Sequence, residues 1–151
     1  MFRVTKEIPF CFGHRLMNYD GKCRNLHGHN GRAVITVAGR DLDDLGMVTD
    51  FATMRKHIGD WIDRTLDHKL LLFRDDPLVQ LLRTAGEQVV ALDEHPTTET
   101  IAKFIFDWVE SEGYPVVEVT MWETPSSYAT YLVSNSTVRL PETAEASLAD
   151  N

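Results

Sequence analysis

The sequence predicts an α+β domain in which two helices lie on one face of a four-stranded antiparallel sheet. Runs of β-branched and aromatic residues lie near both ends of the chain, and two segments with helical periodicity lie between them. Asn, Asp and Gly mark the turns that separate these segments. The resulting order is β-β-α-α-β-β, and 151 residues are enough for one domain with a core of its own.

The first two strands are expected over residues 2–16 and 31–39. Pro9 in the first favours an edge or a bulge, and glycines bound the second, which is rich in β-branched residues. A polar loop over residues 17–25 connects them. We therefore expect the two strands to pair as an antiparallel hairpin.

The first helix is expected over residues 51–66, and Thr49 or Asp50 can cap its start. Its apolar residues recur at helical spacing: Phe51, Met54, Ile58, Trp61, Ile62 and Leu66. The second helix opens at "PTTET", where Thr97 or Thr98 can cap it, and ends at Gly113. Its expected buried residues are Ile101, Ile105, Trp108 and Val109.

The segment between the two helices is a long connector with a short helix after Pro77, and the last two strands are expected over residues 115–124 and 127–140. Residues 141–151 are small and acidic, and we expect a disordered tail there. This leaves a single domain over residues 1–140. Such a sheet has two open edges, which favours assembly of several chains through them.

Composition excludes some classes of function. The net charge is −8, from 15 basic and 23 acidic residues, which argues against a nucleic-acid surface. No segment is long and apolar enough to span a membrane, and we expect a cytoplasmic protein whose two cysteines are thiols. The local cations Arg15, Lys22 and Arg24 nevertheless leave an anionic substrate possible at the segment that they surround.

That segment, "CRNLHGHN", holds the strongest chemical signal. His27 and His29 are two residues apart, so in a strand both side chains point to one face. The predicted hairpin can bring His14 beside them. Three neutral histidines with one open position are typical of catalytic zinc, although a His-x-His pair also occurs in strands that bind no metal.

Other candidates are weaker when taken alone. Cys23 lies between Lys22 and Arg24, and neighbouring cations favour a reactive thiolate, but a loop cysteine can equally be inert. Cys11, between two phenylalanines, is expected to be a buried apolar residue.

Three further residues carry ionisable groups at positions of interest. Asp67 and His68 are neighbours just after the first helix, and Glu123 ends a predicted strand. Each of these features is common without function. His57 is expected on the surface and His95 in a loop.

Six motifs taken together resemble one family. "FGHRL", "CRNLHGHN", "GMVTDF", "LDHKLL", "PTTET" and "WETP" occur in the order of the 6-pyruvoyl-tetrahydropterin and 6-carboxytetrahydropterin synthases. The resemblance implies the tunnelling fold (T-fold), in which three subunits join their sheets into a barrel. It also implies a homo-oligomer, usually a hexamer of two stacked trimers, with active sites between subunits.

The resemblance also implies a role for each site residue. His14, His27 and His29 match the zinc ligands, and Cys23 matches the catalytic thiolate. Asp67 and His68 match acid/base partners supplied by a neighbouring subunit. Glu123 matches the carboxylate that binds the pterin, and the residues matching other positions of the pterin pocket are Thr97, Thr98 and Glu99.

By the same resemblance the substrate is 7,8-dihydroneopterin triphosphate. The four-residue offset from Cys23 to His27 favours the 6-carboxy enzyme of queuosine (7-deazapurine) biosynthesis, which releases acetaldehyde and triphosphate. The alternatives are a 6-pyruvoyl-tetrahydropterin synthase, a non-catalytic pterin- or metal-binding module, and a structural assembly protein. Gly13 and the long connector depart from the family pattern and leave the exact substrate open.

Overall fold

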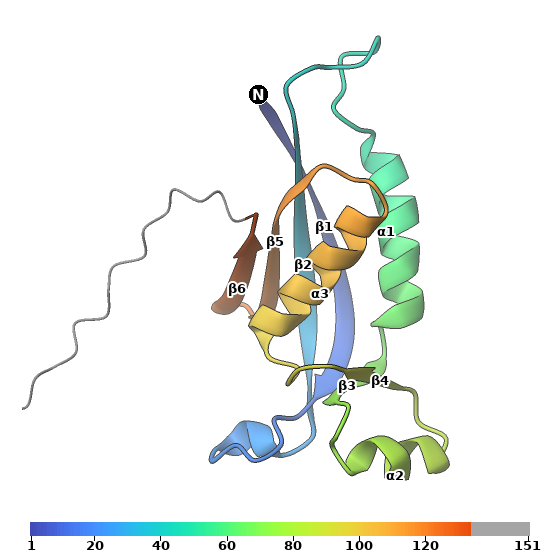
Figure 1. Cartoon of the computed structure of the whole chain (residues 1–151), viewed down its shortest axis with the longest axis vertical. Coiled ribbons are helices and arrows are strands. Elements are labelled where there is room, and N and C mark those ends of the chain that lie inside the picture. Colours follow the sequence, from blue (N-terminus) through green and yellow to red (C-terminus); the bar gives the residue numbers. More distant parts are fainter. Residues whose placement is uncertain (134–151) are drawn as a thin grey trace, which may run out of the picture.

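The computed structural model describes residues 1–133, which form one sheet with three helices (Figure 1). The strand order in the sheet is β4-β3-β1-β2-β5-β6. The four antiparallel strands are β1 (Phe2–His14), β2 (His27–Gly39), β5 (Val116–Thr124) and β6 (Ser127–Leu132). Two shorter strands, β3 (Lys69–Phe73) and β4 (Val89–Leu92), extend the sheet in parallel beyond β1.

The β1–β2 hairpin is the longest pairing in the sheet and agrees with the predicted one. Each strand has 13 residues, and the register sets His14 opposite His27 and Phe12 opposite His29. The second strand starts at His27 rather than at residue 31, so "HGH" lies within the strand. Side chains paired across antiparallel strands share a face, and the hairpin therefore gathers all three histidines on one face.

The predicted α+β fold and its four antiparallel strands are confirmed, but these four strands are not the whole sheet. The connector between the long helices contributes β3, a helix α2 (Leu78–Thr84) and β4, so the sheet has six strands and is mixed. In short apolar runs such as "KLLLF", polar and apolar residues do not alternate, so the sequence cannot distinguish a buried strand from another buried segment. Leu71 and Leu72 are neighbours and both are fully buried, which explains why this strand lacks the alternation of polar and apolar residues.

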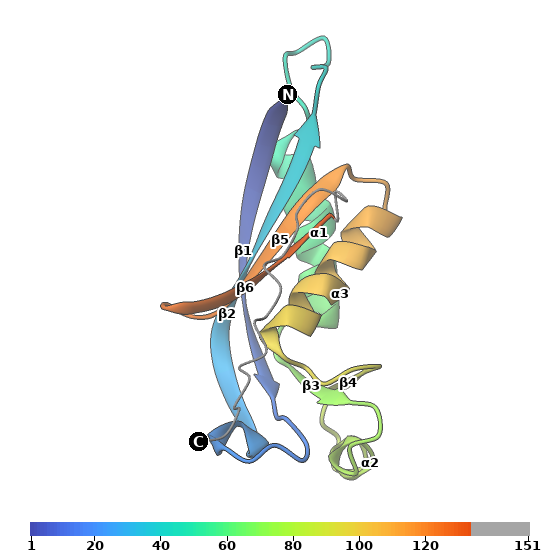
Figure 2. The same ribbon diagram turned by 60° about the vertical axis from the view of Figure 1, so that its left-hand side comes forward.

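The two long helices, α1 (Phe51–Thr65) and α3 (Thr98–Ser111), lie on the same side of the sheet (Figure 2). Asp50 caps α1 by accepting a hydrogen bond from the Ala52 N–H at 3.0 Å. The helices contribute fully buried Ile58, Ile62, Ile101 and Ile105 to the core between them and the sheet.

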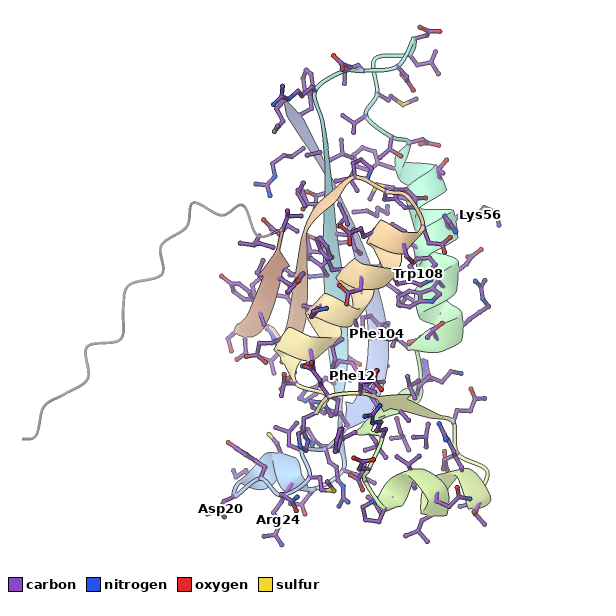
Figure 3. The ribbon with its side chains drawn as sticks, in the orientation of Figure 1. Phe12, Asp20, Arg24, Lys56, Phe104 and Trp108 are labelled. Carbon is purple, nitrogen blue, oxygen red and sulfur yellow. The ribbon has the colours of Figure 1, made fainter. Side chains whose placement is uncertain are left out.

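Trp108, which was expected to be buried, is only partly so. It stacks on Trp61 with ring centroids 4.2 Å apart, in the space between α3 and α1 (Figure 3). The stack closes the outer side of the helix pair.

The end of the molecule near the histidines is tied together by one buried ion pair. Arg15, just after β1, donates two hydrogen bonds to the carboxylate of Asp76, at 2.7 and 2.5 Å. Asp76 also accepts a hydrogen bond from the Leu78 N–H at 2.8 Å. This pair fixes the start of α2 to the end of β1.

Among the helices of residues 1–133, none has both the length and the apolar character to cross a bilayer.

Part of the predicted last strand, the domain boundary at residue 140 and the acidic tail lie outside the described residues. These remain predictions.

Candidate active site

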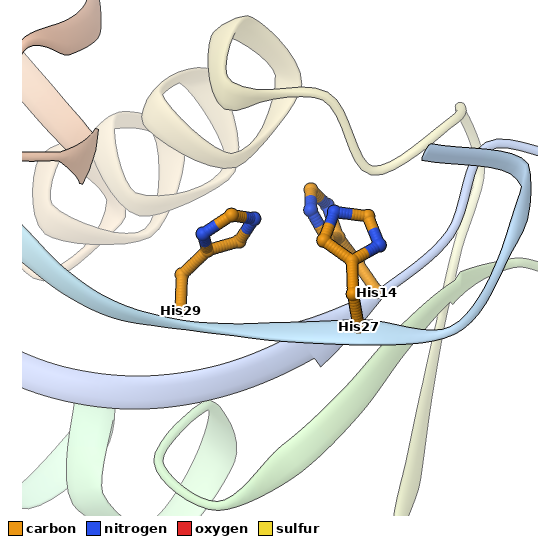
Figure 4. A group of neighbouring side chains, drawn as sticks. All are labelled: His14, His27 and His29. Carbon is orange, nitrogen blue, oxygen red and sulfur yellow. The ribbon is translucent and has the colours of Figure 1, made fainter. Parts of the chain in front are cut away.

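His14, His27 and His29 form a compact cluster, and one ring nitrogen of each lies within 4.8 Å of those of the other two. Their ring centroids are 4.5 to 5.1 Å apart. Figure 4 shows the three rings on the side of the strands where α3 lies. His14 comes from the end of β1 and the other two from the start of β2.

Backbone carbonyls fix the orientation of two of these rings. The His14 Nδ1–H donates to the Pro96 carbonyl at 2.7 Å, and the His27 Nδ1–H donates to the Asn25 carbonyl at 2.8 Å. A carbonyl only accepts, so Nδ1 carries the proton in both neutral rings. Their Nε2 atoms therefore carry the lone pairs that a metal can bind.

The charge state of the cluster also suits a metal. The Nε2 atoms of His14 and His29 are buried and have no hydrogen-bond partner in residues 1–133. Burial lowers the pKa of both side chains, and the neighbouring imidazoles lower it further. The negative charge of Glu123 raises the pKa of both but does not outweigh burial. Neutral, unpartnered imidazoles are the form that binds a transition metal. These three residues thus fit a divalent metal such as zinc.

Glu123, at the end of β5, lies beside this cluster. Its Oε1 lies 3.3 Å from His29 Nε2 but without the geometry of a hydrogen bond, and its Oε2 accepts a hydrogen bond from the Thr98 hydroxyl. The carboxylate retains about a fifth of its exposure and so can still reach a ligand. A molecule bound by Glu123 would consequently lie next to the histidine cluster.

The threonines predicted near this carboxylate have different structural roles. Thr97 is the N-cap of α3 and accepts from the Thr100 N–H at 3.4 Å, whereas Thr98 donates to Glu123. Glu99 lies exposed in the first turn of the helix.

Cys23 lies in the loop that joins β1 to β2, within a short 3-10 turn (Lys22–Arg24). A hydrogen bond of 2.8 Å from the Leu16 N–H to the Cys23 carbonyl closes this loop. The thiol is half-buried and is not among the donors within 4.8 Å of one another in the histidine cluster. Arg24 and Asp20 project from the same loop (Figure 3).

Asp67 and His68 lie on the other face of the sheet. β3 pairs with β1 so that Leu70 lies opposite Gly13, and His68 lines the same recess as Leu70 and Cys11. His14, His27 and His29 alternate to the opposite face of β1 and β2. One chain therefore does not bring the predicted acid/base pair to the predicted metal ligands.

The Asp67–His68 pair is held tightly nonetheless. Asp67 accepts hydrogen bonds from the Cys11 N–H at 2.8 Å and from His68 Nδ1 at 2.7 Å. Burial alone would raise the pKa of Asp67, but these two hydrogen bonds outweigh it, and the pKa lies below its usual value. His68 has φ of 56°, a left-handed conformation that is uncommon for a residue with a Cβ and is seen at functional sites.

Cys11 is not the buried apolar residue that we expected. Alternation turns Phe10, Phe12 and His14 into the interior and Cys11 to the opposite face, where its half-buried thiol donates to Asn30 Oδ1 at 3.1 Å. Cys11, Asp67 and His68 form a second group of donors within 4.8 Å of one another. Cys11 and His68 line an open recess of about 720 Å³.

The carbonyls of Pro96 and Asn25 could not be predicted, because a backbone acceptor has no side-chain signal. Cys11 could have been: alternation with the apolar residues on either side places it on the sheet's other face.

Comparison with known proteins agrees with this geometry. The family model described as 6-pyruvoyl tetrahydropterin synthase matches residues 3–133. A 6-carboxy-5,6,7,8-tetrahydropterin synthase of Rickettsia bellii is 33% identical over 135 residues, covering 85% of this chain and 98% of the relative. A protein of Halobacterium salinarum described as a probable 6-carboxy-5,6,7,8-tetrahydropterin synthase is 38% identical over 126 residues, or 80% of each chain.

Solved structures show the same fold. An uncharacterised protein of Wolinella succinogenes matches with a TM-score of 0.75 and 28% identity, over 88% of this chain and 98% of that one. The 6-pyruvoyl tetrahydropterin synthase of Caenorhabditis elegans matches with a TM-score of 0.66 and 27% identity, over 88% and 96%.

Proposed function

The chain belongs to the 6-pyruvoyl tetrahydropterin synthase family, and on that premise we propose that it is a zinc-dependent 6-carboxy-5,6,7,8-tetrahydropterin synthase. Its substrate is 7,8-dihydroneopterin triphosphate, and its products are 6-carboxytetrahydropterin, acetaldehyde and triphosphate. The atoms balance when one water is consumed. The reaction would supply a precursor for 7-deazapurine synthesis in the cytoplasm.

The observation that carries the proposal is the cluster of His14, His27 and His29. The buried Nε2 atoms of His14 and His29 have no hydrogen-bond partner in residues 1–133, and a nitrogen of His27 lies within 4.8 Å of theirs, as a metal site with room for a further ligand requires. A zinc ion held there would act as a Lewis acid on oxygen atoms of the substrate's side chain.

Glu123 supports the choice of a pterin. The ring N–H and exocyclic amine of a pterin form a two-donor edge, which one carboxylate can accept with both oxygens. Thr98 holds Glu123 in place beside His29, so a bound pterin would extend its side chain toward the metal ligands.

The remaining chemistry is proton transfer. Cys23 as thiolate takes a proton from a side-chain carbon of the substrate, and His68, oriented by Asp67, moves a second proton. Asp67 and His68 lie on the opposite face of their own sheet, so we infer that each active site takes this pair from a neighbouring subunit. A homohexamer built from two trimeric barrels would provide that neighbour and pair the exposed sheet edges.

Two observations favour the 6-carboxy product over the 6-pyruvoyl product. Cys23 precedes His27 by four residues, and the curated relatives described above are 6-carboxy enzymes or a probable one.

The test is incubation of the zinc-loaded protein with 7,8-dihydroneopterin triphosphate, followed by product identification. We expect acetaldehyde and 6-carboxytetrahydropterin in equal amounts. A 6-pyruvoyl product with no acetaldehyde would reject the 6-carboxy assignment, and no turnover by zinc-loaded protein would reject the enzyme.

Variants separate metal binding from proton transfer. We expect His27→Ala to lose both zinc and activity, and Cys23→Ala to keep one zinc per chain while losing activity. His57→Ala, which changes an exposed histidine on α1, is the matched control and should keep both.

A further inference from the structure

Cys11, Asp67 and His68 make a second cluster of metal-binding side chains, separate from the three histidines. One donor atom of each residue lies within 4.8 Å of those of the other two. Metal–ligand bonds of about 2.0–2.3 Å with tetrahedral angles place donors about 3.3–3.8 Å apart. The Asp67 and His68 donors are already 2.7 Å apart, so a rearrangement of at most about 1 Å would bring Cys11 Sγ to these distances, and 77% of the His68 side chain is exposed and can adjust to an ion.

The backbone already holds the three residues together. The His68 N–H donates to the Cys11 carbonyl at 2.7 Å, while the Cys11 N–H donates to Asp67 Oδ1 at 2.8 Å. These two bonds keep His68 in its left-handed conformation after α1 and aim its ring toward the sheet face that carries Cys11. A preorganised set of donors binds a metal with less loss of conformational entropy.

The donor types select the class of cation. A thiolate, an imidazole and a carboxylate together favour zinc or a softer ion such as cadmium over magnesium or calcium. The recess of about 720 Å³ beside the cluster gives an ion and its water access. Because His68 is far more exposed than His14 and His29, this site should fill second.

We propose that Cys11, Asp67 and His68 form a second, weaker site for a thiophilic divalent cation, and that its occupation inhibits the enzyme. The inhibitory part rests on the proposed function, since the ion would occupy the acid/base pair that the reaction requires. The binding part is independent of it, because it depends only on the geometry of the three side chains.

Cobalt titration of the full-length, metal-free protein tests the binding. A histidine-only site gives weak visible bands, whereas a thiolate ligand adds a strong near-ultraviolet charge-transfer band. We expect that band to grow with the second equivalent of cobalt. Cys11→Ser should remove the band and reduce the stoichiometry from two to one, and Cys23→Ser, the matched control, should keep both.

A band that survives in Cys11→Ser, that disappears in Cys23→Ser, or that never forms in excess cobalt would overturn the proposal. His68→Asn provides an independent variant, because asparagine tolerates a positive φ but has no imidazole. It should also bind only one equivalent, and two equivalents would count against the site.

Inhibition is measured on the zinc-loaded enzyme with added cadmium. We expect Cys11→Ser to need at least tenfold more cadmium than the wild type for half inhibition. Equal sensitivity would contradict the inhibitory role. If the wild type has no activity on the pterin, the proposed function fails, while the cobalt titration still decides whether the second site exists.

Discussion

The chemistry of the histidine cluster is set by backbone carbonyls as much as by the histidines. Pro96 and Asn25 hold the protons of His14 and His27 on Nδ1, and burial lowers the pKa of His14. The same burial makes the metal-free protein sensitive to acid, because burial disfavours the charged, protonated imidazole.

For the metal-free protein we expect the free energy of unfolding to fall as the pH decreases from 7 through 6.5 and below. The pKa of His14 and of His29 is lower in the folded protein than the usual 6.5, so the unfolded chain binds more protons in that window. Each such proton contributes a slope of at most about 1.4 kcal/mol per pH unit.

Urea unfolding between pH 5 and pH 8 measures this slope. His14→Gln should reduce it and His57→Gln, at the surface, should not. An unchanged slope in His14→Gln would contradict the effect of burial.

Thr97 and Thr98 allow stability and activity to be separated. Thr97→Ala removes a helix cap and should lower the free energy of unfolding by about 1 kcal/mol with little change in kcat/KM. Thr98→Val keeps the side-chain shape but loses the donor to Glu123, and should raise KM. Urea unfolding and steady-state kinetics of both variants measure these effects, and the reverse pattern would contradict the assignments.

At the scale of elements, the connector between the long helices is an integral part of the sheet. β3 begins directly after His68, which lines the recess, and the Arg15–Asp76 pair holds α2 against the end of β1. The carboxylate of Asp76 is fully buried and the Arg15 side chain is about one-fifth exposed.

We expect Asp76→Asn to lower the free energy of unfolding by about 3 kcal/mol, because it leaves a largely buried guanidinium without its anion. The hydrogen bonds from Arg15 hold the pKa of Asp76 below its usual 3.8. The contribution of the pair is therefore present above that pH and is lost as the pH falls through the lower folded-state value.

Chemical denaturation at pH 7 and pH 3 measures this. Asp93→Asn is the control, because its pair with Arg74 is exposed, and it should cost less than about 1 kcal/mol. Equal losses in the two variants at pH 7 would contradict a special role for the buried pair.

The elements with clear periodicity were predictable from the sequence, and the short ones were not. The helix at Phe51–Thr65 and the β1–β2 hairpin follow from apolar spacing and turn residues. β3 and β4 have five and four residues and depend on parallel pairing with distant strands, which no local pattern encodes. The histidine cluster was predictable because alternation and a hairpin suffice to gather it, whereas the group around Cys11 needs the unpredicted β3.

At the scale of the whole molecule, the two halves of the proposed active site lie on opposite faces of one sheet. The three histidines lie on the side of the strands where α3 lies (Figure 4). His68 lines the recess on the other face together with Cys11 and contacts Asp67. A catalytic site that needs both halves must then combine two chains.

Activity of mixed assemblies tests this directly. Cys23→Ala and His68→Asn should each be inactive alone. When equal amounts are unfolded together and reassembled, random mixing should give about a quarter of the wild-type activity, since one site in four pairs an intact Cys23 with a neighbour's intact His68. Mixed oligomers that form and bind zinc but show no activity would contradict a site shared between subunits.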